Sequence, residues 1–415
     1  MRRTGESYTT ARRNVLARAA RAAAPPLPAG LVKGYDRFGA DQHRHSAIAA
    51  QLLRQAGITA PHTGEPFSEA MVCGLAGGIG FMYAVFEYRG VPPIVTIVAQ
   101  HHPEPWVPAA LNRLGVAHVE AHSSATPRAM AAIEAALAQD QPVYTSVGRP
   151  LLPWHGGDPA LATEPYGVVV AGASGGDLLI DDGAAAPHAL SKAEFANAWA
   201  AYRKGRHHRL LLTQPSAARV PLAEAIGAAI ATTAAHLTGP VLGNSFDTNF
   251  GFSGMAKFAD QLRDGRTKSG WRNRFGEPAT FAAAMRRLYS CLELEYTAPG
   301  ATRPLYAAFL EEAATVPGTR AETLRAAAAL FRASGAHWSQ VAALAAEHAG
   351  PYAELCERQL LCRLTGRRDE QLDAQIDALR LTGSIVDETL FATLADLVDA
   401  ARHQEEQAIT LLAQP

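Results

Sequence analysis

The chain has 415 residues, of which 48% are hydrophobic and 19% are charged, and its formal net charge is −1. This length exceeds what one hydrophobic core usually organises, so we expect two domains. A charge so close to zero lacks the basic excess typical of nucleic-acid or anionic-membrane partners, and we predict neither. The four cysteines lack C-x-x-C spacing, which argues against a disulfide framework and a structural zinc site.

Residues 1–30 form an N-terminal extension with six arginines and one acidic residue, Glu6. They lack the continuous apolar segment of a secretory signal and instead predict an amphipathic helix over residues 9–24, ended by Pro25 and Pro26. No apolar run anywhere reaches the length of about 18 residues that a spanning helix needs. We therefore expect a cytoplasmic location.

Residues 31–215 alternate between helical and extended patterns, which predicts an α+β domain. The expected helices are residues 46–55, 68–83, 106–114 and 126–139. The expected strands are residues 94–99, 118–121, 143–147, 167–171 and 177–181. Ser174, Gly175 and Gly176 separate the last two strands and predict a hairpin turn.

Residues 216–415 carry helical periodicity only, which predicts an all-α second domain after the polar stretch 213–220. Glycine and proline separate its segments. The expected helices are residues 222–237, 252–263, 278–296, 304–314, 321–332, 337–348, 351–364, 369–381 and 387–412.

Two glycine-rich segments partly resemble a nucleophile elbow and a phosphate-binding loop, but both have simpler structural interpretations. Residues 172–176 fit G-x-S-x-G, yet a strand follows them where a nucleophile elbow needs a helix, so we interpret them as a hairpin turn. The glycines at 74, 77, 78 and 80 match neither G-x-G-x-x-G nor a P-loop. Their spacing favours a helix face that another part of the chain approaches closely.

The polar cluster His43, Arg44, His45 and Ser46 opens an apolar helix. Papain-like folds carry a nucleophilic cysteine at such a helix start, where the helix dipole stabilises a thiolate. This chain has Arg44 there instead. Glu69 begins the next helical segment and is either a first-turn acid or a buried functional carboxylate.

Histidines occur in pairs at 43 and 45, 101 and 102, and 207 and 208. Such pairs can supply two metal ligands, with His155, Asp181 or Asp182 as a third, or they are ordinary partly exposed side chains. The second interpretation is favoured, and we predict no metal and no other cofactor. Arg303, just before Pro304 in the helical domain, either binds a substrate carboxylate or forms an interdomain salt bridge.

Several segments, in this order, resemble the butirosin-biosynthesis protein H family. They are His43 with Ser46, residues 67–81, 141–153, 168–181, 250–254 and 303–313. The resemblance spans residues 33–412 and implies a papain-like N-terminal domain followed by a helical domain of uncharacterised role. It implies an acyltransferase that moves an aminoacyl group from a carrier-protein thioester to an amine of a natural product, through a cysteine–histidine pair.

The sequence differs from the family at the residues that the family uses for catalysis. The family's cysteine falls on Arg44, its histidine on Tyr166 and its aspartate on Gly148, while Asp181 or Asp182 survives. Arginine stays protonated and cannot act as a covalent nucleophile. The cysteine mechanism is therefore excluded at this position.

Two functions remain open. The first is acyl transfer without an acyl-cysteine in antibiotic biosynthesis, with His43 or His45 as base, Arg44 on a carbonyl or carboxylate, and Tyr166 as a positioning group. Asp181 completes this catalytic set, and Ser46, Glu69 and Arg303 are the expected substrate contacts. The second is a catalytically inactive partner protein that keeps the cleft.

The expected partners are an acyl carrier protein or another biosynthetic enzyme, and a small-molecule amine. A homodimer stays open. Cys73 is a minor alternative nucleophile.

Overall fold

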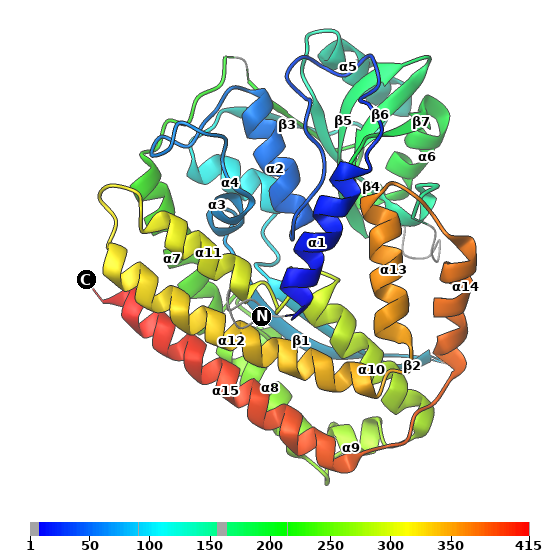
Figure 1. Ribbon diagram of the computed structural model, residues 1–415, viewed down its shortest axis with the longest axis vertical. Helices are drawn as coiled ribbons and strands as arrows, with labels where there is room; N and C mark the ends of the chain where they lie inside the picture. Colours follow the sequence, from blue (N-terminus) through cyan, green and yellow to red (C-terminus); the bar gives the residue numbers. More distant parts are fainter. Residues whose placement is uncertain (1–7, 90, 156–163, 214, 415) are drawn as a thin grey trace.

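A computed structural model describes residues 8–89, 91–155, 164–213 and 215–414. The described strands all lie before residue 213, and from residue 222 the described regular structure is helical (Figure 1). This confirms the predicted α+β organisation, with a sheet-containing N-terminal region and a helical C-terminal region. The papain-like assignment and the domain boundaries at residues 30 and 215 stay predictions.

The N-terminal region contains two antiparallel sheets. One is the hairpin of β1 and β2, and the other has six strands in the order β3-β8-β4-β5-β6-β7. The strands are β1 (Ile79–Tyr88), β2 (Val91–Gln100), β3 (His118–Ala121), β4 (Val143–Gly148), β5 (Pro165–Ser174), β6 (Asp177–Asp181), β7 (His188–Ser191) and β8 (Arg209–Leu212). The helices are α1 (Tyr8–Ala22), α2 (Arg44–Gln55), α3 (Glu69–Leu75), α4 (Trp106–Arg113), α5 (Thr126–Leu137) and α6 (Lys192–Ala201), with a short 3-10 turn η1 (Arg149–Leu151).

The predicted hairpin between β5 and β6 is confirmed. Ser174 pairs with Asp177 across it. Gly175 and Gly176 have φ angles of 59° and 97°, which side chains with a Cβ adopt only with strain. Ser174 therefore ends a strand at a tight turn, as the interpretation of residues 172–176 requires.

The helix predicted over residues 68–83 is wrong beyond residue 75. α3 ends at Leu75, and Gly77 and Gly78 then turn the chain with φ angles of 107° and 63° into strand β1. The continuous apolar pattern across this turn conceals the change from helix to strand. The close approach expected at these glycines does occur, because a Cβ on Gly74 would lie 2.1 Å from the ring of Phe309.

The helical region follows the predicted order with two differences, an additional short helix over Trp271–Arg274 and the joining of two predicted helices. Its helices are α7 (Leu222–Thr238), α8 (Gly251–Arg263), α9 (Trp271–Arg274), α10 (Pro278–Glu293), α11 (Arg303–Ala313), α12 (Ala321–Glu347), α13 (Tyr352–Leu364), α14 (Glu370–Ala378) and α15 (Glu388–Ala413). The two helices predicted over residues 321–332 and 337–348 are one, α12. Gly335 lies within it because a Cβ there would approach Pro304 to 2.8 Å, so the glycine serves packing and does not end the helix.

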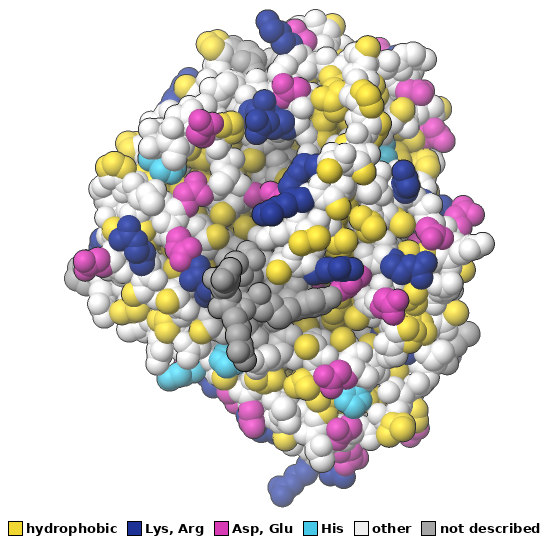
Figure 2. All heavy atoms as spheres, in the orientation of Figure 1, with side chains coloured by type: hydrophobic (Ala, Val, Ile, Leu, Met, Phe, Trp, Pro, Cys, Tyr) yellow, Lys and Arg dark blue, Asp and Glu magenta, His cyan; other side chains and the backbone are white. Residues whose placement is uncertain are grey.

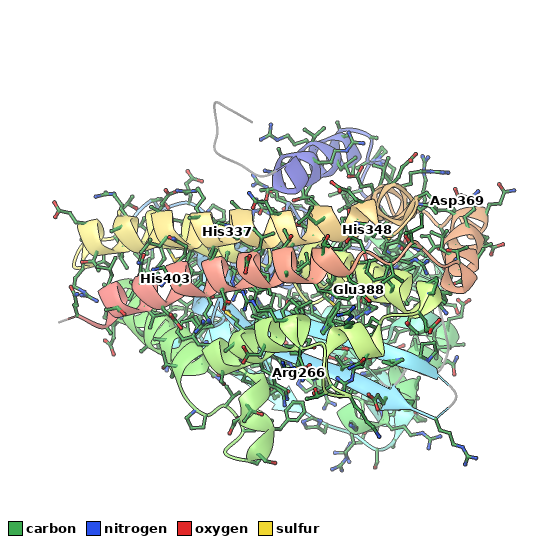
Figure 3. All side chains as sticks on the ribbon, turned by 90° about the horizontal axis from the view of Figure 1, so that it is seen from below. Arg266, His337, His348, Asp369, Glu388 and His403 are labelled. Carbon is green, nitrogen blue, oxygen red and sulfur yellow. The ribbon has the colours of Figure 1, made fainter. Side chains whose placement is uncertain are left out.

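One apolar core joins the two regions. It contains side chains of α2, α3, α4 and the β1–β2 hairpin together with side chains of α7, α8, α10, α11, α12 and α15. A second core lies between the six-stranded sheet and helices α5 and α6. α12 and α15 run side by side on the outside of the helical region (Figure 3). None of the described helices is long and apolar enough to cross a membrane.

Candidate functional site

Helix α2 begins beside a buried chain of hydrogen bonds. The indole of Trp106 donates to the Ser46 hydroxyl over 3.2 Å, and this hydroxyl lies 2.8 Å from His43 Nδ1. His43 Nε2 lies 2.9 Å from the amide oxygen of Gln100. His43 therefore accepts at Nδ1, where it also caps α2, and donates at Nε2.

These contacts occupy both nitrogens of His43. Burial lowers the pKa of His43 to about 4, although its hydrogen bond with Gln100 acts in the opposite direction. The imidazole is therefore neutral at neutral pH, with no free lone pair. The geometry gives His43 a capping role, and the catalytic role predicted for it stays a prediction.

Glu69 holds the loop that leads into α2. Its carboxylate accepts hydrogen bonds from the backbone N–H groups of Asp41, at 2.9 Å, of Gln42, at 2.8 Å, and of His43. Burial raises the pKa of Glu69, and these three donors oppose that effect. Glu69 thus fixes the start of α2, and its predicted contact with substrate stays a prediction.

Arg44 extends from the first position of α2 toward strand β5. Its guanidinium carbon lies 3.9 Å from the centre of the Tyr166 ring, and its N–H groups donate to the Gly167 carbonyl and to His45 Nε2. Because a guanidinium only donates, His45 must accept at Nε2. Burial, followed by the charge of Arg44, holds the pKa of His45 well below its ordinary value.

The structure brings together the three positions at which the sequence departs from the family. Tyr166 lies opposite Val147 in the β4–β5 pair, and Gly148 lies opposite Pro165. Arg44 lies against Tyr166 from the facing helix. Burial raises the pKa of Tyr166 to about 12, so its hydroxyl keeps its proton at neutral pH.

Asp181 and Asp182 at the end of β6 point to different partners. Asp181 accepts from the Tyr35 hydroxyl at 2.7 Å and from the Gly183 N–H at 2.8 Å, and burial raises its pKa to about 6. Asp182 lies 2.8 Å from His155 Nε2. The predicted residue, Asp181, therefore supports Tyr35, while its neighbour bonds a histidine.

His155 and Asp182 form a buried pair beside Tyr166. Trp154 Nε1 donates to Asp182 over 2.8 Å, and His188 Nε2 lies 3.2 Å from its other oxygen. Although burial raises it, contacts with His155 and His188 hold the pKa of Asp182 well below its ordinary value. The His155 ring meets the Tyr166 ring edge-on, with centroids 4.8 Å apart.

The free nitrogen of His155 is the distinctive feature of this pair. Because Nε2–H donates to Asp182, Nδ1 carries the lone pair, and it is buried with no hydrogen-bond partner among the described residues. From the sequence, His155 is expected only as a third metal ligand, and Asp182 is expected either as such a ligand or as the aspartate that survives from the family pattern. Their closeness depends on how the turn after β4 meets the end of β6, and no local pattern in the sequence reports it.

Two other candidate site residues, Arg303 and Cys73, are buried in the interior of the protein. Arg303 is fully buried and forms its ion pair with Glu405 inside the helical region, so the pair is not the interdomain salt bridge. Its contact with the sheet-containing region is a hydrogen bond to the Ala99 carbonyl, and a contact with substrate stays a prediction. Cys73 is fully buried, and burial raises the pKa of its thiol far above that of a reactive cysteine.

The other two histidine pairs, at 101 and 102 and at 207 and 208, lie in structural contacts of their own. The His101 ring packs on His236, with centroids 4.9 Å apart, and His208 bonds Glu120 at 2.8 Å. In the described ranges, no group of three or more histidine, cysteine, aspartate or glutamate side chains is arranged to hold a metal ion.

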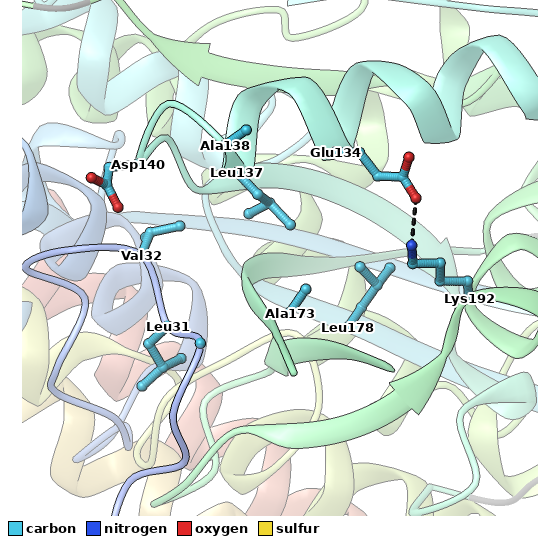
Figure 4. A pocket seen from close by; sticks show the side chains of 10 residues that line it. Leu31, Val32, Glu134, Leu137, Ala138, Asp140, Ala173, Leu178 and Lys192 are labelled. Carbon is cyan, nitrogen blue, oxygen red and sulfur yellow. Dashed lines mark hydrogen bonds and ion pairs between the residues drawn. The ribbon is translucent and has the colours of Figure 1, made fainter. Parts of the chain in front are cut away.

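A groove of about 500 Å³ lies away from these residues, between the 30–32 segment, α5 and the β5–β6 hairpin (Figure 4). Its lining includes Leu31, Leu137 and Leu178, and the ion pair of Glu134 and Lys192 spans 2.6 Å at one side. It shares no lining residue with the Arg44–Tyr166 site.

The fold and site define an α+β protein in which a helix N-terminus faces a sheet, followed by a helical domain. Residues 43–183 match the family described as "Butirosin biosynthesis protein H, N-terminal", and residues 188–357 match a "Domain of unknown function (DUF4872)". The chain therefore carries the N-terminal domain of the butirosin biosynthesis protein H family, followed by DUF4872, which confirms the resemblance. A comparison with curated proteins finds no match.

Proposed function

We propose that this chain is an acyltransferase-like protein of specialised-metabolite biosynthesis. In this proposal it moves an (amino)acyl group from a carrier-protein thioester to an amine without an acyl-cysteine intermediate. The matched family's name links its N-terminal domain to the biosynthesis of butirosin, an antibiotic. The replacement of the nucleophile position by Arg44 requires that any transfer be direct.

Direct aminolysis needs a base, an electrophilic stabiliser and a proton donor, all held in place. The amine nitrogen attacks the thioester carbonyl, the C–N bond forms and the C–S bond breaks. The amine proton goes to the base, and the leaving thiolate takes up a proton. Arg44 supplies positive charge for the developing oxyanion, and the Tyr166 phenol supplies a proton donor.

The observation that carries the proposal is the position of His155. Its Nε2–H is held by Asp182 at 2.8 Å, its Nδ1 lone pair is unpartnered, and its ring lies against Tyr166. Burial lowers the pKa of His155 to about 4, so the ring is neutral and able to accept a proton. We therefore assign the base to His155, since the lone pairs of His43 and His45 are already engaged.

The test is acyl transfer from acyl-carrier-protein thioesters to a panel of amines, followed by mass spectrometry of products and intact protein. We expect amide product and no acyl adduct on the protein. His155→Gln and Asp182→Asn should each slow transfer by about 100-fold or more, the usual contribution of a positioned base. The matched control is His403→Gln on the outer side of α15 (Figure 3), which should leave the rate unchanged. Wild-type rates in both site variants would exclude His155 as the base.

A second function, a catalytically inactive partner protein, is favoured by one observation. The Arg44 guanidinium is already engaged by the Gly167 carbonyl, His45 and Tyr166, so it fills the position that a nucleophile occupies in the family. In that case the protein should form a stable complex with a carrier protein or another biosynthetic enzyme and show no turnover. Co-elution of the two proteins in size-exclusion chromatography, without amide product, would support this function over the first.

A further inference from the structure

The space beside His155 is too small for substrate. His155 and Trp154 line a crevice of about 10 Å³, which holds about one water molecule. The His155 side chain is only 5% exposed, and its Nδ1 has no hydrogen-bond partner among the described residues. A thioester carbonyl and an amine need far more room than one water molecule does. Transfer through this crevice therefore requires that one of its walls move.

The wall opposite Trp154 and His155 is a pair of helices. The other residues that line the crevice lie between Gln359 and Asp373, in α13, in the turn that follows it and in α14. Gln359 Nε2 donates to the Asp373 carboxylate over 2.8 Å and joins the two helices, which lie next to each other (Figure 1). We call residues 352–378 the α13–α14 hairpin. It belongs to the helical region, so the crevice lies where the two regions of the chain meet.

Around the turn after α13, the hairpin contacts the sheet-containing region. The Leu364 carbonyl accepts from the Ala185 N–H over 2.8 Å, and both side chains lie in one small apolar cluster with Leu16 of α1. The Arg368 guanidinium donates to the Pro153 carbonyl over 3.5 Å. These contacts hold the crevice closed.

The rest of the α13–α14 hairpin is lightly packed. The structure describes both helices in full, and only Leu355, Cys356 and Leu364 of the 13 residues of α13 and Leu372 of the nine residues of α14 are buried. In α10, against which α13 packs, 11 of the 16 residues are buried. Because buried apolar surface is the main source of stability, the hairpin separates from its neighbours at a lower free-energy cost than α10 does.

The outer face of the α13–α14 hairpin carries charged side chains. Arg358 and Arg367 are exposed, and Figure 2 shows Lys and Arg side chains over α1 and α13. Such side chains stay hydrated whether the hairpin lies against the sheet-containing region or moves outward. Movement therefore costs only the contacts on the inner face.

Both ends of the α13–α14 hairpin suit a hinge. Gly350 precedes it with a φ angle of 66°, and a Cβ there would meet no atom of the described residues within 4 Å, so this glycine serves the backbone conformation and not packing. After the 3-10 turn η5 (Leu379–Leu381), residues 382–387 have no regular secondary structure. The Ser384 N–H donates to the Pro278 carbonyl over 3.1 Å and ties this end to α10. A lightly held middle between two fixed ends permits hinge motion.

We propose that the α13–α14 hairpin is a lid on the His155 site, which swings away from Trp154 and His155 to admit substrate, and that the structure shows its closed position. The inference rests on the proposed function for the role of the site, and it adds how access to that site is regulated. A lid limits the access of water, which competes with an amine for a thioester carbonyl.

The experiment locks the hairpin with a disulfide. Ala185→Cys combined with Leu364→Cys places two thiols where backbone atoms already lie 2.8 Å apart and both side chains enter one cluster, which suits disulfide geometry. The readout is carbethoxylation of His155 by diethyl pyrocarbonate, mapped by peptide mass spectrometry. We expect His155 in the oxidised double variant to react about tenfold or more slowly than in its reduced form, because a locked lid keeps the reagent out. The exposed His403 is the internal control and should react equally in both forms.

A second variant decides the question without a disulfide. Leu364→Ala removes a buried side chain that anchors the hairpin, so His155 should react about fivefold or more faster than in wild type. Leu361→Ala on the same helix is the matched control, because this leucine is 37% exposed, and it should react like wild type. The buried His43 should stay unmodified in every variant, which separates movement of the hairpin from unfolding of the whole protein.

The inference is overturned if neither the disulfide nor Leu364→Ala changes the rate at His155, if Leu361→Ala acts as strongly as Leu364→Ala, or if His43 reacts along with His155. It is also overturned if the oxidised double variant transfers acyl groups as fast as the reduced form. Gated modification of His155 in a protein that shows no acyl transfer would overturn the proposed function and leave this inference standing.

Discussion

The guanidinium carbon of Arg44 lies 3.9 Å from the centre of the Tyr166 ring, and this contact joins the start of α2 to strand β5. A cation over an aromatic face is stabilising by about 0.5–2 kcal/mol, and more when water is excluded. The two positions are those at which the family resemblance expects a cysteine and a histidine. A catalytic cysteine needs a nearby imidazole to take its proton, whereas the cation of an arginine packs well against an aromatic ring. The replacement of cysteine by Arg44 and the replacement of histidine by Tyr166 are therefore compatible with each other.

The first prediction tests whether the start of α2 still favours a negative charge. We expect a thiol introduced by Arg44→Cys to react with iodoacetamide at pH 7 about fivefold faster than one introduced by Arg54→Cys. The reason is that a helix N-terminus stabilises a thiolate and a C-terminus does not, each by about 0.3–1 kcal/mol. Arg54 is the matched control because it lies in the last turn of the same helix.

Intact-protein mass spectrometry reads out this comparison. The wild-type background should be low because Cys73, Cys291 and Cys356 are buried, and burial raises the pKa of the half-buried Cys362. Equal rates at positions 44 and 54 would show that the start of α2 offers no electrostatic advantage to a thiolate.

The second prediction concerns the carboxylate that holds the loop before α2. Glu69→Gln replaces one accepting oxygen by an NH₂ group that faces backbone donors. We expect the free energy of unfolding in urea to fall by about 1–3 kcal/mol, the cost of leaving such donors unsatisfied. The exposed Glu65→Gln nearby should change it by less than about 0.5 kcal/mol. An equal effect of both substitutions would contradict the assigned role of Glu69.

The third prediction follows from the buried capping histidine. The pKa of His43 is about 4 in the folded protein, below the ordinary value of 6.5, so the unfolded state binds a proton first as the pH falls. Stability therefore falls between pH 6.5 and pH 4, by up to about 1.4 kcal/mol per pH unit from this group. His43→Gln should reduce that slope in urea unfolding measured across the window, and the exposed His403→Gln should not.

Local patterns in the sequence predicted much of the fold. The Gly175–Gly176 turn and the helical periodicity after residue 221 were sufficient for the β5–β6 hairpin and for most helices. Strand β1 was missed because an apolar run continues across Gly77 and Gly78, and their left-handed backbone is not visible in hydropathy. The continuity of α12 was missed because Gly335 serves packing against Pro304.

The candidate site, like the fold, could be predicted from the sequence only in part. Arg44 and Tyr166 were singled out from the family pattern, and the structure places them in contact. The pairing of His155 with Asp182 could not be predicted, because His155 follows the 3-10 turn η1 and Asp182 follows strand β6, and the two meet only when the sheet forms. Of the two neighbouring aspartates, only the register of β6 decides which one faces His155.

The fourth prediction concerns a buried ion pair within the helical region, whose arginine also contacts the sheet-containing region. Arg303 and Glu405 are both fully buried and bond twice, at 2.8 Å and 2.9 Å, while Arg303 also donates to the Ala99 carbonyl of β2. Arg303→Met should lower the free energy of unfolding by about 3–5 kcal/mol, because it leaves a buried carboxylate without its cation. The exposed pair of Arg332 and Glu311 is the matched control, and Arg332→Met should cost less than about 1 kcal/mol.

A double variant separates the loss of the pair from the burial of an unpaired charge. Glu405→Gln removes the charge yet keeps an oxygen that accepts from Ser334 and Trp338. Arg303→Met with Glu405→Gln should therefore be more stable in urea than Arg303→Met alone, since no unpaired buried charge remains. If the double variant is less stable than the single one, the uncompensated carboxylate is not the main cost.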